Sequence, residues 1–315
     1  MKTNSENRDA LLREVYEGFE RSVKHIPPKF LYDKCGSELF DRITDTEDYY
    51  PKRTELQIMR ANAKEIAERV GSGRVVVEFG TGTGEKTELL LSLLQRPAGY
   101  VSIDVSASML KEAVVALRTR YPQLTIEPLV GDFHTDLKLP KIAGCEKGPL
   151  IFFPGSTIGN FTPAQRSKFL ERMRGLCGDD GCLLIGVDLK KDPHRLHAAY
   201  NDSEGWSAAF GLNLLERLNR DFGANFQIEN FRYYAHYNPS EGRVDMHVVS
   251  LADQRVRVGD RHFDFANGES LLTEFAYKFT LAEFAENAQD AGFNVNSVWL
   301  DEKRMFSVQL LEPAR

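Results

Sequence analysis

The sequence predicts an α/β protein built on a parallel sheet with helices on both faces. Three observations support this. Residues 75–79 (VVVEF) form a continuous apolar run that ends in a glycine-rich turn, as is typical of a buried parallel strand that leads into a helix. Strand-like and helix-like segments then alternate as far as residue 188. The chain closes with two strand-like segments joined as a hairpin.

Taken in order, helical spacing of apolar residues first predicts helices over 9–24 and 54–70, with a short amphipathic turn over 38–43 between them. The alternating region follows, where we expect strands over 75–79, 100–105, 125–130, 149–153 and 181–188, with helices over 86–94, 106–120 and 163–177. Parallel strands of this kind need helical crossovers, so helices are expected on both faces of the sheet.

The alternation of strand-like and helix-like segments stops at residue 189. A helical tract (195–222) precedes strand-like segments, and a helix over 281–291 and the closing strands 294–300 and 305–311 then complete the alternating pattern. The strand-like segments are 231–237, 243–251, 255–265 and 271–279. We therefore predict an α+β substrate-binding module over 191–278, inserted into the sheet domain. An N-terminal segment over 1–56 contributes to the substrate domain. The core spans 57–190 and is completed by 279–315.

Composition excludes several classes of protein. The 315 residues are 42% hydrophobic, enough for a sizeable core, and their net charge of −6 gives no support to nucleic-acid binding. No apolar run approaches the length of a membrane span, and the polar N-terminus has no secretory pattern. The four cysteines, Cys35, Cys145, Cys177 and Cys182, form no C-x-x-C pair. We expect reduced thiols in a cytoplasmic monomer whose partner is a small molecule.

The glycine turn is predicted to bind a nucleotide-like cofactor. It reads E-x-G-x-G-x-G over residues 78–84, and glycine allows the backbone to bend sharply beside a ligand. Asp104 ends the second strand, where an acid can bind ribose hydroxyls, and Asp132-Phe133 follows the third. The dinucleotide pattern G-x-G-x-x-G and the Walker ending G-K-[ST] are both absent from the turn. Together these features resemble S-adenosylmethionine-dependent methyltransferases, which implies a Rossmann-like class I sheet of seven strands with S-adenosylmethionine as cofactor.

Four further segments narrow the resemblance. Residues 32–55 (YDKCGSELFDRITDTEDYYPKRTE), 154–160 (PGSTIGN), 199–202 (AYND) and 273–279 (TEFAYKF) are similar to motifs of the histidine Nα-methyltransferase family of ergothioneine biosynthesis. The resemblance implies methyl transfer to the α-amino nitrogen of a free amino acid, with histidine as the leading substrate and trimethylhistidine (hercynine) as product.

The resemblance also implies roles for individual residues. The positions that match cofactor contacts are Gly80, Gly82, Lys86, Asp104, Asp132 and Phe133. Tyr50 and Asn160 match the residues that hold the amino group, and we expect them to be catalytic because uncharged hydrogen bonds do not lock the amine as ammonium. The remaining substrate positions are Gly155 in the same loop, Tyr200 for the carboxylate, Met246 in the wall of the site and Glu274 for the imidazole.

Position 276 departs from the family pattern, because Ala276 stands where a serine gives the imidazole a second polar partner. A site without that partner should discriminate less well for histidine. Three hypotheses therefore stay open: histidine held through Glu274, another aromatic amino acid such as tryptophan, or a non-catalytic sensor that binds without turnover.

No metal site is predicted. His194-x-x-His197 has helical ligand spacing, but no third ligand accompanies it at a recognisable distance.

Overall fold

The computed structural model describes residues 4–80, 84–104, 107–131, 138–145 and 147–314. Three residues predicted to contact the cofactor, Gly82, Asp132 and Phe133, lie outside them. The chain divides into two units. We call residues 51–190 with 278–315 the core unit, and residues 1–50 with 191–277 the inserted unit. The division falls at residues 50, 190 and 277, beside predicted boundaries at 56, 190 and 278.

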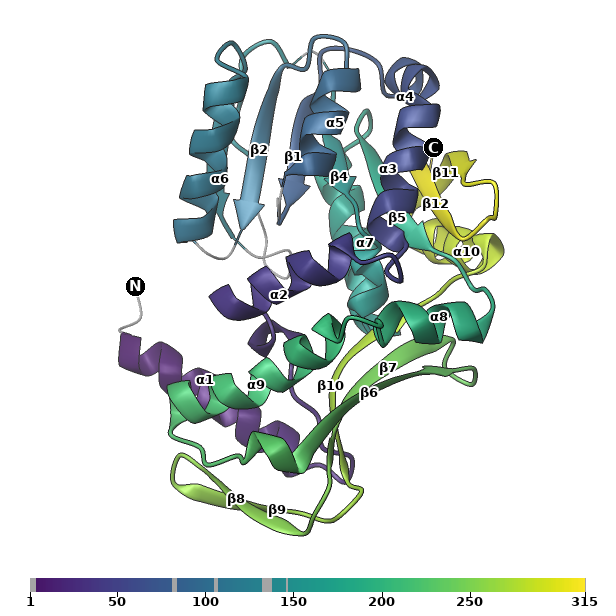
Figure 1. Cartoon of the computed structure of the whole chain (residues 1–315). Helices are drawn as coiled ribbons and strands as arrows, with labels where there is room; N and C mark the ends of the chain where they lie inside the picture. Colours follow the sequence, from purple (N-terminus) through teal and green to yellow (C-terminus); the bar gives the residue numbers. More distant parts are fainter. Residues whose placement is uncertain (1–3, 81–83, 105–106, 132–137, 146, 315) are drawn as a thin grey trace. The chain divides into compact units, whose positions relative to one another are not determined.

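The core unit contains a seven-stranded sheet in the order β11-β12-β5-β4-β1-β2-β3 (Figure 1). Neighbours from β3 to β5 are parallel, whereas β12 pairs antiparallel with both β5 and β11. The predicted α/β fold with a C-terminal hairpin is thus confirmed. The strands are β1 (Val75–Phe79), β2 (Gly99–Asp104), β3 (Ile126–Val130), β4 (Leu150–Phe153), β5 (Cys182–Asp188), β11 (Phe293–Leu300) and β12 (Phe306–Pro313).

Helices pack on both faces of this sheet. On one face, a buried apolar cluster joins the strands to α3, α4, α5 and α6 (Figure 1). Phe152 of β4 belongs to that cluster, whereas its neighbour Phe153 lies 4.4 Å, between ring centroids, from Phe169 of α7. Because successive strand residues point to opposite faces, α7 covers the other face. The helices are α3 (Pro51–Ala61), α4 (Ala63–Val70), α5 (Glu85–Leu93), α6 (Ala107–Arg120), α7 (Pro163–Cys177) and α10 (Leu281–Asp290), with the short 3-10 helix η2 (Thr157–Asn160) after β4.

The inserted unit combines helices with two small antiparallel sheets, in the orders β10-β7-β6 and β8-β9 (Figure 1). Its core is rich in phenylalanine, with Phe19 packed edge-on against Phe226, Phe263 and Phe265. The elements are α1 (Asn4–Phe19), η1 (Pro28–Phe30), α2 (Lys34–Asp45), α8 (Pro193–Tyr200), α9 (Trp206–Phe222), η3 (Ile228–Asn230), β6 (Phe231–Asn238), β7 (Arg243–Ser250), β8 (Gln254–Val258), β9 (Arg261–Phe265) and β10 (Ser270–Tyr277).

Three predicted elements are each divided in the structure. The helix expected over 54–70 breaks at Asn62, whose side chain donates to the Ile58 carbonyl at 2.8 Å. The tract over 195–222 breaks where the Asp202 carboxylate accepts the first backbone N–H groups of α9. The strand expected over 255–265 is a hairpin that turns at Gly259, whose φ is +58°.

Two general expectations can be compared with this fold. All four cysteines are free, with Cys177 and Cys182 buried and Cys35 and Cys145 exposed. Among the described residues, no helix combines the length and apolar character that crossing a membrane requires.

Candidate active site

Two predicted cofactor residues and one predicted substrate residue lie where parallel strands end. Gly80 follows β1, Asp104 ends β2, and Gly155 follows β4 by two residues. These strands are neighbours, so their carboxyl ends share one edge of the sheet, where α/β proteins bind ligands. Gly80 turns at φ +70° and donates its N–H to the Ile103 carbonyl at 2.8 Å. A Cβ on Gly80 would meet no described atom within 4 Å.

Glu78, the acid of the glycine motif, is a buried structural residue. One of its carboxylate oxygens accepts hydrogen bonds from Thr87 of α5 and Tyr100 of β2, each at 2.6 Å. Burial raises the pKa of Glu78 to about 7, although both hydroxyl donors act in the opposite direction. The acid therefore ties the start of α5 to the strands that flank the turn.

Lys86 is held by a carboxylate that sequence reasoning missed. Its Nζ lies 2.5 Å from Oε2 of Glu55, which is only 1% exposed. Glu55 also accepts the Gly155 N–H, at 2.9 Å to the nearer oxygen. A Cβ on Gly186 would lie 2.0 Å from Glu55 Oε1, so glycine is required beside this carboxylate. Glu55 thus links Lys86, which is predicted to bind the cofactor, to the loop that follows β4. No motif in the sequence indicates this link.

The loop after β4 presents Gly155 and Asn160. Gly155 has φ +82° and Ser156 has φ +57°, both left-handed. The Ser156 hydroxyl compensates for that conformation by accepting the Asp188 N–H at 2.9 Å, which fastens the loop to the end of β5. Asn160 is half-buried at the end of η2. The loop is therefore fixed at the carboxyl end of the sheet.

In the inserted unit, three predicted substrate residues share one face of the β10-β7-β6 sheet. Glu274 pairs directly with Met246, and Ala276 follows two residues along β10. Because side chains alternate along a strand, all three point the same way. Their exposures are 5%, 6% and 5%. We call these residues the acceptor face, and their arrangement suits recognition of a mostly apolar ring with one polar edge.

Four tyrosines lie around Glu274, and the sequence analysis had named only Tyr200. The Tyr32 hydroxyl donates to Glu274 Oε1 at 3.3 Å, and the Tyr49 ring lies 6.0 Å from that of Tyr200. The Tyr233 hydroxyl donates to the Tyr200 carbonyl at 3.0 Å. Burial of the hydroxyl, together with the Glu274 charge, raises the pKa of both Tyr32 and Tyr233 well above its ordinary value. Both are therefore neutral hydrogen-bond donors at physiological pH.

The residues beside Tyr200 in the sequence hold it in place. The Asn201 side chain exchanges two hydrogen bonds with the backbone of Ala235, at 2.9 and 3.0 Å. Ser203 donates its N–H and its hydroxyl to Asp48, both at 2.8 Å, which brings the segment containing Tyr49 beside Tyr200. The AYND motif thus serves mainly to position one tyrosine.

Tyr50, predicted to contact the substrate amino group, has neighbours that differ from those of Tyr49. It is fully buried, and its hydroxyl accepts a hydrogen bond from Lys191 Nζ at 2.6 Å. The Lys191 ammonium and the Arg195 guanidinium lie 4.6 and 5.3 Å from the centre of its ring. The adjacent residues Tyr49 and Tyr50 therefore point into different surroundings, a distinction that a two-tyrosine motif does not reveal.

Comparison with known proteins assigns the family. The model of a family described as histidine-specific, S-adenosylmethionine-dependent methyltransferase matches residues 11–313, nearly the whole chain. The chain belongs to this family. Its members are enzymes that use S-adenosylmethionine.

Curated relatives agree with the family. The chain is 39% identical over 311 residues to a histidine N-alpha-methyltransferase of Mycolicibacterium smegmatis, covering 96% of this chain and 94% of that protein. A protein of the same name from Mycobacterium tuberculosis is 39% identical over 307 residues, with the same coverage. A 4-dimethylallyltryptophan N-methyltransferase of Claviceps purpurea is 24% identical, covering 93% of this chain and 92% of that protein. The relatives of the chain are thus named for two different acceptors.

Proposed function

We propose that this enzyme transfers methyl groups from S-adenosylmethionine to the α-amino nitrogen of free histidine, giving trimethylhistidine for ergothioneine biosynthesis. The observation that carries the proposal is the 39% identity, over almost the full length of both chains, to proteins named histidine N-alpha-methyltransferase. The relative named for a tryptophan derivative is only 24% identical, so histidine is favoured over tryptophan.

The acceptor face suits an imidazole. Glu274 offers a carboxylate to a ring N–H, and Met246 opposite it offers a polarizable apolar contact. Tyr32 donates to one Glu274 oxygen, which helps to orient the carboxylate on the acceptor face. Loss of a charge-assisted hydrogen bond of this kind costs about 1.5–3 kcal/mol.

The cofactor supplies an activated methyl group, so the protein's task is to position the amine and exclude water. On the core unit, we assign Gly80, Lys86 and Asp104 to cofactor binding, together with Gly82, Asp132 and Phe133. Gly155 and Asn160 are assigned to the amino end of the substrate, and Tyr200 to its carboxylate. These roles rest on the match to the family motifs and on the placement of the described residues at strand ends.

We revise the role of Tyr50. Two cations, Lys191 and Arg195, lie against its ring, and such surroundings disfavour an ammonium group that must bind before it loses its proton. Tyr49 lies instead beside Tyr200. We therefore assign the contact with the amino group to Tyr49, and a positioning role to Tyr50.

Matched variants test this assignment and the proposed substrate together. Purified chain is supplied with S-adenosylmethionine and either histidine or tryptophan, and methylated products are followed by mass spectrometry. We expect turnover of histidine, with a kcat/KM about tenfold or more below that of the unmodified enzyme for Tyr49→Phe and a smaller loss for Tyr50→Phe. Turnover of tryptophan alone would contradict the substrate, and equal losses in the two variants would contradict the revised role.

A further inference from the structure

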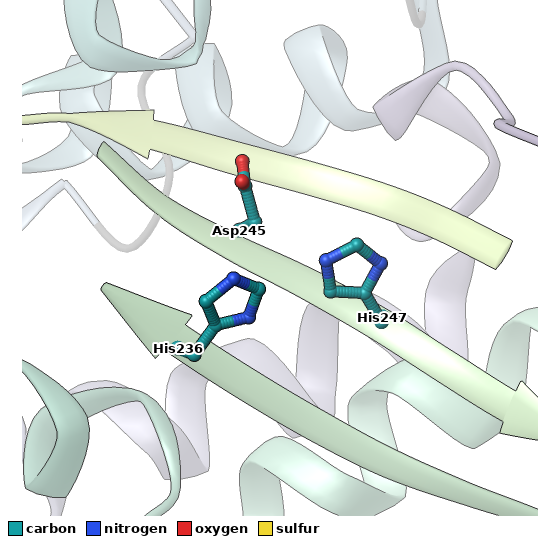
Figure 2. Close-up of side chains that lie close together, drawn as sticks. All are labelled: His236, Asp245 and His247. Carbon is teal, nitrogen blue, oxygen red and sulfur yellow. The ribbon is translucent and has the colours of Figure 1, made fainter. Parts of the chain in front are cut away.

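The outer face of the β10-β7-β6 sheet carries a group of side chains that the methyltransferase reaction does not use. His236 of β6 lies directly opposite Asp245 of β7, and His247 follows Asp245 by two residues. One potential ligand atom from each residue lies within 4.8 Å of the other two. Figure 2 shows the two imidazole rings and the carboxylate rising from adjacent strands.

We infer that His236, Asp245 and His247 form a binding site for a divalent transition-metal ion such as Zn²⁺. Two imidazoles and one carboxylate are a ligand set that zinc accepts, with further positions left to water. Binding distances of about 2.0–2.2 Å would bring the ligand atoms to roughly 3.4 Å from one another. The side chains must therefore close in by about an ångström, which small rotations about χ1 and χ2 can supply.

One ring nitrogen of each histidine lacks a hydrogen-bond partner in the described chain. Nδ1 of His236 and Nδ1 of His247 are both buried, and no described group bonds to either. The rings stack at 5.4 Å with an interplanar angle of 13°. A buried imidazole nitrogen without a hydrogen-bond partner is unfavourable, and a bound ligand that contacts it would remove this penalty.

The electrostatic surroundings prepare the site and also limit its affinity. Asp245 is held by Arg243 at 2.6 Å and by Asn238 at 3.0 Å, one on each carboxylate oxygen. These partners orient the carboxylate, and each of its oxygens keeps a second lone pair. The Arg243 charge opposes a cation, however, so we expect micromolar rather than nanomolar affinity.

The site would lie directly behind the acceptor face. Met246 stands between Asp245 and His247 on β7, and its side chain points to the opposite face, where it pairs with Glu274. Because alternate residues point to opposite sides of a strand, a metal bound here clamps β6 to β7 without occupying the amino-acid site. The metal is therefore expected to stabilise the protein and not to act in methyl transfer.

Titration of tag-free, EDTA-treated chain with ZnCl₂ by calorimetry tests the inference. We expect one site, a raised melting temperature on binding, and affinity lowered on the order of 100-fold in His236→Gln and in His247→Gln. The matched control is His262→Gln, because His262 is an exposed histidine on β9. It should bind zinc as the unmodified chain does.

Asp245→Asn and Co²⁺ spectroscopy keep the test decisive if a histidine variant fails to fold. Co²⁺ bound to the unmodified chain should show visible absorption of nitrogen–oxygen coordination, and Asp245→Asn should weaken it. Absence of zinc binding to the unmodified chain would overturn the inference. So would unchanged affinity in folded His236→Gln, His247→Gln or Asp245→Asn.

Discussion

Position 276 is the residue at which the acceptor face departs from the family pattern. Ala276 is buried on the same face as Glu274 and Met246. A serine there would place a hydroxyl beside the ring that Glu274 is proposed to bind. We expect Ala276→Ser to lower the KM for histidine about 2- to 10-fold, the worth of one hydrogen bond, with little change in kcat. Steady-state kinetics with histidine as the varied substrate measure this.

The matched control is Ala266→Ser, the same change at an exposed position after β9. It should leave the KM for histidine unaltered. If Ala276→Ser also leaves that KM unaltered, residue 276 does not contact the imidazole, and the missing serine has no bearing on substrate choice.

The sequence predicted the roles of some residues of the site and missed those of others. Glu274, Met246 and Ala276 share a face because strand alternation places them there, and alternation can be read from sequence. Tyr49 and Tyr50 are adjacent at the start of a helix, where no such rule says which of them meets Tyr200. Glu55 was missed because its partners, Lys86 and Gly155, lie 31 and 100 residues further along the chain.

At the scale of elements, Glu78 joins β1 to β2 and α5, and this junction should be sensitive to pH. Burial raises the pKa of Glu78 from 4.5 to about 7, so the folded protein binds a proton more tightly than the unfolded chain does. The stabilisation is complete below pH 4.5 and is lost as pH rises through about 7. It amounts to about 3 kcal/mol at most.

Glu78→Gln removes the titrating group but keeps its shape. We expect the free energy of unfolding of the unmodified chain to fall between pH 5 and pH 7 relative to that of the variant. Urea denaturation of both proteins across this range supplies the comparison. Parallel pH profiles would show that Glu78 is not protonated preferentially in the fold.

The end of β5 carries a second element-scale link, a buried ion pair. Lys278 Nζ lies 2.8 Å from Asp188 Oδ2, and the two side chains are 2% and 1% exposed. Removing one partner leaves a buried charge, so Lys278→Met should cost about 3–5 kcal/mol of unfolding free energy. The double variant Lys278→Met/Asp188→Leu should recover much of that loss. Chemical denaturation of the three proteins tests this, and a neutral effect of Lys278→Met alone would contradict it.

Helices and strands were predicted well where the local pattern of apolar residues determines them. The predicted bounds of the five parallel strands agree with the structure to within a residue or two. Four of them are buried along almost their whole length, as continuous apolar runs predict, whereas β3 lies at the edge of the sheet and is partly exposed. Local hydrogen bonds between side chains and the backbone decided where two helical tracts break. Asn62 and Asp202 each use a side chain to satisfy backbone groups and end a helical tract that periodicity alone would continue.

At the scale of the whole molecule, the chain combines a core unit that carries the cofactor residues with an inserted unit that carries the acceptor face. We propose that the glycine turn binds the cofactor and that the acceptor face of the inserted unit selects the acceptor. Family membership makes the sensor hypothesis unnecessary, since the matched model describes methyltransferases and the positions of Gly80, Lys86, Asp104 and Asn160 are intact. The monomeric state stays a prediction.

The most direct test of the histidine assignment is a competition among acceptors. The purified chain is incubated with isotope-labelled S-adenosylmethionine and an equimolar mixture of the twenty common amino acids, and label is located by mass spectrometry. The account predicts that histidine gains one, two and finally three methyl groups on its α-amino nitrogen, ahead of every other amino acid. Label accumulating on another amino acid while histidine stays unmodified would contradict it.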